Sequence, residues 1–131
     1  MVEITDIKGD RTFIRDDTIT VVIAGSADDP RPFTKVHGSF GSGIEQTKEA
    51  AAALVSRLAT RLVKLSRPND TPVWVNAAAV TTLRPPLDIE LLTAPRLVRS
   101  VIMIGDFYHS LREDVATASR LLGIGGRPAS A

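Results

Sequence analysis

Apolar and polar residues alternate along the start of the chain in a pattern that returns 61 positions later. A shift of 61 lays residues 2–22 over residues 63–83 without a gap. Apolar residues coincide in five matched pairs, which are Val2 with Val63, Ile4 with Leu65, Phe13 with Trp74, Ile14 with Val75 and Ile19 with Val80. A pattern that keeps such positions while the polar ones vary predicts a tandem repeat.

The period of this pattern predicts strands first and a helix at the end of each half. In the first half we expect strands at 2–7, 11–15, 18–24, 33–37 and 42–45, with turns between them at Lys8-Gly9-Asp10 and in the glycine-rich segment after residue 37. Alanine, valine and leucine then recur three and four positions apart from residue 48 to about residue 60. This spacing predicts an amphipathic helix, for which Thr47 is the expected N-cap.

The second half repeats this order with one insertion. We expect strands at 63–66, 73–76, 79–83, 98–104 and 107–111, and a last helix that begins after Ser110. Glu113 follows Ser110 by three positions, as in a capping box, and Gly123 is the expected end of the helix. Residues 84–97 form a proline-bounded loop that is longer than its counterpart in the first half.

The predicted fold is therefore α+β, a tandem repeat of two small antiparallel β-meander and C-terminal helix units. The units span residues 1–61 and 62–123, and residues 124–131 are predicted to be a disordered tail. Because about 60 residues bury little apolar surface alone, we expect the units to pack against each other with pseudo-twofold symmetry. Phe13 and Trp74, at matched positions, are the expected core anchors.

The inserted loop is the largest difference between the halves and the first candidate for function. It is too apolar for an idle surface loop, since it carries Leu87, Ile89, Leu91 and Leu92. Exposed apolar groups of this kind mark contacts with the core or with another protein. We therefore predict an interaction loop at these four residues.

The second half also carries the motifs of a known family. Arg67-Pro68-Asn69-Asp70 stands at its first turn, Val75-Asn76 at a strand end, Gly105-Asp106 at a second turn and Arg112-Glu113-Asp114 before its helix. In these features it resembles the FlbD/SwrD family of small bacterial flagellar motility proteins, here duplicated and carrying the insertion 84–97. The resemblance implies a shared small fold and a place in a motility machine, and it brings no catalytic residues.

Composition excludes some functions and leaves others open. The net charge is +1, and the division at Leu62 gives 8 − 9 = −1 before it and 8 − 6 = +2 after it, so neither half attracts a polyanion strongly. With no cysteine, the chain has no disulfide and no thiolate metal site. No signal peptide pattern and no apolar run of roughly 18 residues is present. We expect a cytoplasmic protein, or one assembled from the cytoplasm into a larger particle.

Four groups of residues could carry chemistry. The glycine-rich 38–43 could bind phosphate but is more typical of a hairpin turn. His37 and His109 could contribute to a metal site, although two histidines on strands are more often structural. The carboxylate pairs Asp16-Asp17 and Asp28-Asp29 fall at loop edges, where solvated turn residues are usual. A basic patch of Arg84, Arg96 and Arg99, near aromatic residues, could bind nucleic acid.

No polar constellation recurs in both halves, so we expect a non-enzymatic module. The favoured function is protein–protein interaction or assembly, with itself or within a larger bacterial or phage machine of flagellar or virion type. A nucleic-acid-binding regulator that uses the basic patch is the alternative, and a small enzyme is the least favoured one. The sequence indicates no cofactor, metal or small-molecule ligand.

Overall fold

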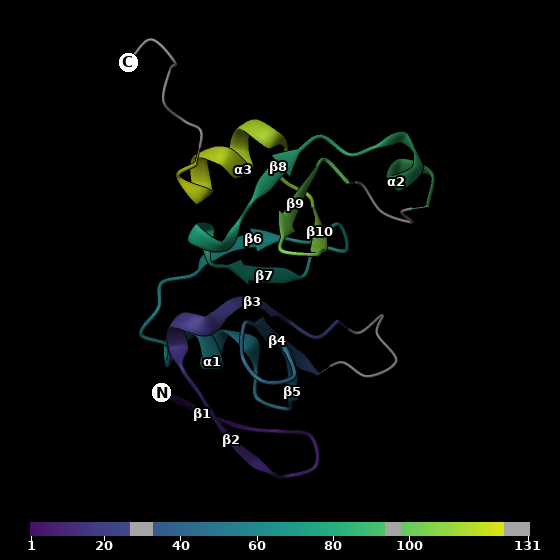
Figure 1. The fold of residues 1–131 in the computed structure, drawn as a ribbon. Helices are drawn as coiled ribbons and strands as arrows, with labels where there is room; N and C mark the ends of the chain where they lie inside the picture. Colours follow the sequence, from purple (N-terminus) through teal and green to yellow (C-terminus); the bar gives the residue numbers. More distant parts are fainter. Residues whose placement is uncertain (27–32, 94–97, 125–131) are drawn as a thin grey trace.

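The computed structural model describes residues 1–26, 33–93 and 98–124, with residues 92 and 93 described by their backbone alone. The described chain is α+β, as the sequence predicts, and contains strands, short α-helices and two 3-10 turns (Figure 1). In the first half these are β1 Val2–Thr5, β2 Arg11–Ile14, η1 Asp16–Thr18, β3 Ile19–Ile23, β4 Thr34–Gly38, β5 Ile44–Thr47 and α1 Ala51–Ser56. In the second half they are β6 Val63–Ser66, β7 Pro72–Val75, η2 Ala77–Ala79, β8 Thr82–Arg84, α2 Asp88–Thr93, β9 Ser100–Ile104, β10 Phe107–Leu111 and α3 Val115–Leu122.

In the described ranges the strands form three antiparallel sheets, and the largest of them contains strands from both halves of the sequence. Its order is β5-β4-β3-β7-β6, while β1 and β2 form a separate hairpin and β8, β9 and β10 a three-stranded sheet in the order β10-β9-β8. The link between the halves is the pairing of β3 with β7, in which Val22 stands opposite Trp74. The boundary at residue 61 thus separates two stretches of sequence that share one sheet.

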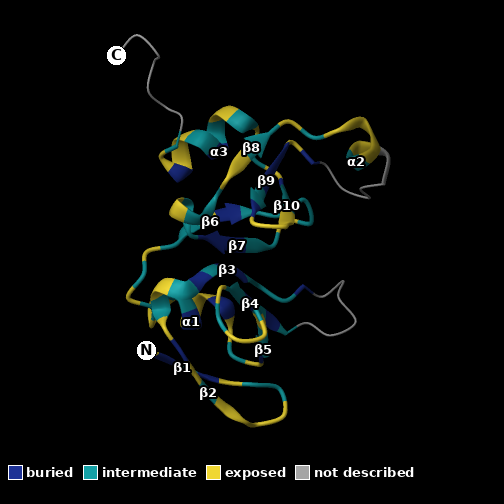
Figure 2. Cartoon of the chain, viewed as in Figure 1, coloured by how far each residue is buried: buried dark blue, intermediate teal, exposed yellow. Residues whose placement is uncertain are grey.

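Two hydrophobic cores lie on the two faces of this linking pair. Alternation along β3 sends Val22 into the first core and Val21 into the second. Trp74, from the second half, packs into the first core beside Ile4 and Leu54. Each core thus contains a residue from the other half. Figure 2 shows the buried residues concentrated on the strands between the two ends of the molecule, whereas β2 and α2 carry many exposed ones.

Corresponding elements begin at matching positions in the two halves. Shifts of 61 relate the first residues of β1 and β6, of β2 and β7, and of η1 and η2. Polar contacts recur as well. The Oγ1 of Thr34 donates to the carbonyl oxygen of Glu49 at 2.7 Å, and the Oγ of Ser100 donates to that of Glu113 at 2.6 Å. Three element starts and one side-chain bond therefore correspond between the halves, while α2 occurs in the second half alone among the described residues.

The pseudo-twofold packing predicted above is not seen in this pairing. A twofold axis that relates the halves and pairs β3 with β7 would also pair β8 with β2. Among the described residues, however, β2 pairs with β1 alone and β8 with β9 alone. Figure 1 places the β1–β2 hairpin and β8 at opposite ends of the molecule. The contact between the halves therefore joins two different surfaces.

Several local predictions were wrong for identifiable reasons. Residues 84–97 are not simply a loop, because they contain α2. Ser110 lies in β10, and the cap of α3 is Asp114, whose carboxylate accepts the N–H of Thr117 at 2.7 Å. Thr47 ends β5, and the N-cap of the shorter α1 is Ala50, without a side-chain bond. The end of α3 at Gly123, which adopts a left-handed conformation with φ of 69°, is confirmed.

Phe13 is the one predicted core anchor that the structure contradicts. Trp74 is 8% exposed, whereas Phe13 is 59% exposed. Phe13 shares its strand face with Arg11 and Arg15, and it pairs in register with Glu3, so it lies on the polar side of the hairpin. The predicted tail 124–131 lies outside the described residues except for Ile124.

Candidate functional site

Two surfaces at opposite ends of the molecule combine an open strand edge with exposed apolar side chains. At one end, β2 carries Phe13 with its edge away from β1 unpaired in the described residues. The hairpin is rigid at its turn, since the Asp6 carboxylate accepts the N–H groups of Lys8 and Asp10, each at 2.9 Å. Gly9 adopts a positive φ of 93° there. The turn therefore holds Phe13 on an ordered strand.

The other end is formed by β8 and the helix α2 that follows it. The guanidinium of Arg84 makes a bidentate ion pair with Glu90, at 2.8 and 3.1 Å, so the helix is fastened to the strand. Glu90 also accepts the N–H of Leu87 at 2.6 Å. These bonds, first that of Arg84, lower the pKa of Glu90 and keep it ionised at neutral pH.

The helix α2 presents apolar side chains to solvent. Leu87, just before it, is 54% exposed, Ile89 is 61% exposed and Leu91 is 48% exposed. The fourth residue of the predicted interaction loop, Leu92, has a side chain outside the described part of the structure. Three of the four predicted residues are thus brought together on one short, anchored helical segment.

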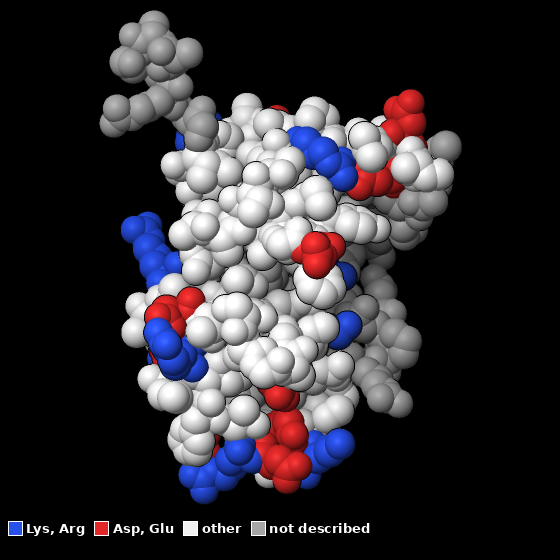
Figure 3. All heavy atoms as spheres, viewed as in Figure 1, with Lys and Arg blue, Asp and Glu red and all other residues white. Residues whose placement is uncertain are grey.

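The predicted basic patch is only partly described. Arg84 is engaged by Glu90, Arg99 is exposed, and Arg96 lies outside the described residues. Figure 3 shows lysine and arginine side chains intermixed with acidic ones at the β1–β2 end of the visible face, while the middle of that face is mostly uncharged. A continuous positive surface of the kind that follows a phosphate backbone is not visible on this face.

His37 on β4 and His109 on β10 lie next to each other across the two halves. Their ring centroids are 5.8 Å apart, and Phe107 packs edge-on against His37 at 6.0 Å. Burial lowers the pKa of both rings, that of His109 to about 4, so both are neutral at pH 7. In the described chain no carboxylate hydrogen-bonds to either ring, and no group of three metal-ligating side chains is present there. The pair thus lacks the partners that a metal site or a general base requires.

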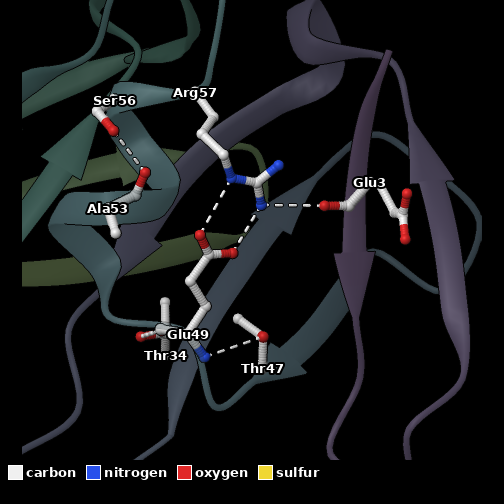
Figure 4. Close-up of polar contacts among 7 residues, drawn as sticks. All are labelled: Glu3, Thr34, Thr47, Glu49, Ala53, Ser56 and Arg57. Atoms are coloured by element: carbon white, nitrogen blue, oxygen red, sulfur yellow. Dashed lines mark hydrogen bonds and ion pairs between the residues drawn. The ribbon is translucent and has the colours of Figure 1, made fainter.

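An open cavity of about 580 Å³ is lined by β1 and the turn after it, by residues 47–49 at the end of β5, and by Arg57. Its most prominent polar group is Arg57, which donates to both carboxylate oxygens of Glu49, at 2.6 and 3.0 Å, and to the carbonyl oxygen of Glu3 at 3.0 Å (Figure 4). The Oγ1 of Thr47 accepts the N–H of Glu49 at 3.2 Å. These charges neutralise each other and fasten α1 to β1, which is a structural role.

The remaining candidates have structural contacts. The glycine-rich segment 38–43 is the turn between β4 and β5, closed by the bond from the Gly38 N–H to the Gly43 carbonyl, and a strand follows it rather than a helix. Asp16 accepts the N–H of Ala59 at 2.8 Å, which lowers its pKa, and Asp17 pairs with Arg15 at 2.7 Å. The pair Asp28-Asp29 lies outside the described residues.

No protein family, curated protein or solved structure matches the chain. Within the described ranges, none of the helices is long and apolar enough to cross a membrane. The open edge at β2 was missed by the sequence reasoning, which placed Phe13 in the core. A signal was available, because arginine stands two positions before and two positions after Phe13 and therefore on the same face of the strand.

Proposed function

We propose that this protein is a non-enzymatic protein–protein interaction module that acts in the assembly of a larger bacterial or phage machine, of flagellar or virion type. The observation that carries the proposal is the exposure of three apolar side chains, Leu87 directly before α2 and Ile89 and Leu91 on it, where an ion pair fastens the helix to β8. Exposed apolar patches on an ordered element are typical of contacts between proteins.

We further propose that the chain is a tandem duplication whose halves contact each other head to tail. The matched element boundaries and the matched bonds of Thr34 and Ser100 support the duplication. The pairing of β3 with β7, without an equivalent pairing of β2 with β8, supports the head-to-tail relation. In this interpretation the insertion that contains α2 gives the second unit a surface for contact with other proteins that the first unit lacks.

The test replaces the two exposed leucines at this site, Leu87 before α2 and Leu91 within it. The tagged protein is cross-linked in its native host, and the amount of each captured host protein is measured. For the double variant Leu87→Asp/Leu91→Asp we expect this amount to fall at least about tenfold, because buried charge opposes an apolar contact. Leu121→Asp, on α3 and 45% exposed, is the matched control and should leave the cross-linked set unchanged. If the wild type, the double variant and the Leu121→Asp control capture equal amounts of host protein, a role for α2 in binding is contradicted.

A further inference from the structure

The contact between β3 and β7 shows how one half of this chain covers the core of the other. Trp74 stands opposite Val22, and with it in place Val22 and Ile19 are 0% exposed. The backbone adds bonds at both ends of the ladder, from the Asn76 N–H to the Thr20 carbonyl at 2.8 Å and from the Ala24 N–H to the Pro72 carbonyl at 3.3 Å. The free edge of β3, the third strand of the first unit, is therefore paired with β7, the second strand of the second unit.

The second unit has a corresponding third strand, β8, against which no strand of the described chain packs in this way. At a shift of 61, Val80 and Leu83 correspond to Ile19 and Val22, and both are partly exposed at the edge of the second core. The local geometry is retained, since Thr81 Oγ1 donates to the Met103 carbonyl at 3.1 Å as Thr20 Oγ1 donates to the His37 carbonyl at 3.2 Å. The β8 edge is thus shaped like the β3 edge and lacks its partner among the described residues.

The first unit has the complementary surface. Its second strand, β2, carries Phe13 at the position that corresponds to Trp74, and Phe13 remains exposed where Trp74 is buried. The two open edges lie at opposite ends of the molecule (Figure 1), so one copy does not pair its own ends. Open, ordered strand edges are templates for pairing with another chain.

We propose that copies of this protein join head to tail, with β8 of one copy adding antiparallel to β2 of the next. The inference rests on the proposed function and names its partner as a second copy of the chain. The register follows from that of β3 and β7, so that Leu83 stands opposite Phe13, Arg84 opposite Thr12 and Thr82 opposite Ile14. A contact between two different surfaces generates a ring or a filament, depending on the rotation between copies.

The side chains of the two edges match in polarity at two of the three proposed pairs, while the third places Thr82 opposite Ile14 where the template has Val21 opposite Val75. Inside the chain, the apolar Ile23 stands opposite the apolar Val73. In the proposed contact both residues of the corresponding pair are polar, because Arg84 takes the place of Ile23 and Thr12 takes the place of Val73. The central pair stays apolar in both cases, with Leu83 and Phe13 in place of Val22 and Trp74. Cross-strand pairs of like polarity stabilise a sheet.

The proposed ladder is shorter than its template. The Thr81 carbonyl would accept the Arg15 N–H, as the Thr20 carbonyl accepts that of Asn76. Pro85 corresponds to Ala24 but has no N–H to donate, so the last bond of the template is absent. The contact between copies is therefore weaker than the contact within a copy, and association depends on protein concentration.

The first experiment measures mass by sedimentation velocity over a wide range of protein concentration. We expect the average mass of the wild type to rise with concentration, and Phe13→Glu to weaken this association about tenfold or more. Leu121→Glu is the control and should associate like the wild type. Because Phe13 is exposed, the variant should keep the circular dichroism spectrum and thermal unfolding of the wild type. A wild type that is monomeric at every concentration would overturn the proposal.

The second experiment tests register and polarity in a chain that contains no cysteine of its own. Thr12→Cys and Arg84→Cys are made in separate proteins, mixed and oxidised, and a disulfide-linked dimer is expected only in the mixture. Thr82→Cys mixed with Thr12→Cys is the off-register control, because a shift of two residues exceeds the span of a disulfide. Cross-linking by Thr12→Cys alone, or equally in the control mixture, would overturn the head-to-tail register.

The two proposals fail separately. If the wild type stays monomeric while the α2 variant loses its cross-linked host proteins, self-assembly is wrong and the interaction module stands. If the α2 variant cross-links normally while Phe13→Glu abolishes association, the α2 surface is wrong and self-assembly stands.

Discussion

Two partly buried histidine rings, one from each half of the chain, lie side by side. The Nδ1 of His37 is buried without a hydrogen-bond partner, and the ring of His109 packs edge-on against the same ring. Burial is the first cause of the lowered pKa of His109, followed by the charges of His37 and Arg67. Lys35 adds to the effect at His37. A proton on either ring is therefore unfavourable in the folded state.

This environment predicts that acid destabilises the protein. The pKa of His109 falls from 6.5 to about 4 on folding, so between these values the unfolded chain binds more protons and stability falls as pH falls. We expect His109→Gln to remove about 2 kcal/mol of the difference in unfolding free energy between about pH 7 and about pH 4.5, measured in urea. Tyr108→Phe, an exposed change on the same strand, should keep the wild-type pH dependence. Equal slopes for His109→Gln and the wild type would contradict this origin.

At the scale of the elements, short helices depend on specific end contacts. α3 has eight residues, and its first turn is satisfied by the Asp114 carboxylate. The same bond to Thr117 is the first cause of the lowered pKa of Asp114. α2 has six residues and is held by the Arg84–Glu90 ion pair instead. Helices of this length are marginal without such contacts.

The cap of α3 gives a direct test of this dependence. Asp114→Ala is expected to lower the free energy of unfolding by about 1 kcal/mol, because the N–H of Thr117 loses its acceptor. Ser110→Ala is the matched comparison, since the sequence pattern favours Ser110 as the cap, and it should change stability by less than about 0.5 kcal/mol. Urea unfolding monitored by circular dichroism measures both. A larger loss in Ser110→Ala than in Asp114→Ala would contradict the assignment.

At the scale of the whole molecule, the exchange of residues between cores makes the halves interdependent. Trp74 fills the first core and Val21 the second, and the sheet that carries them is continuous. Displacement of β7 would remove Trp74 from the first core. Displacement of β3 would remove Val21 from the second core. The described chain is therefore expected to unfold as one cooperative unit.

Truncation of the two matched aromatic residues, Trp74 and Phe13, tests this interdependence, because one is buried between the halves and the other is exposed. Trp74→Ala is expected to cost about 3 kcal/mol and to lower the stability of both halves together, because it opens a cavity at their junction. Phe13→Ala, at the matched but exposed position, should cost less than about 0.5 kcal/mol at low protein concentration. Urea unfolding followed by tryptophan fluorescence in Phe13→Ala, and by circular dichroism in both, gives the values. Two separate transitions in the wild type would contradict a single unit.

Local patterns predicted most elements of each half. The strand at residues 63–66 and the glycine stop at Gly123 are as expected, because turn chemistry and alternation are properties of neighbouring residues. The α2 segment was missed since its prolines indicate a loop, and the Arg84–Glu90 pair that anchors it is a contact between a strand and the following helix. Of the candidate site, the exposed leucines could be predicted from their apolar excess, whereas their geometry could not.

The sequence by itself determined the α+β class and the order of the strands, because apolar period and turn residues act over short distances. Only the tertiary structure decided which strands pair between the halves, since that depends on the summed packing of residues that are far apart in the chain. The same fold buries Trp74 and exposes Phe13, although both are aromatic and occupy matched positions. Their difference arises because β3 pairs with β7 and no strand of the described chain covers the open edge of β2.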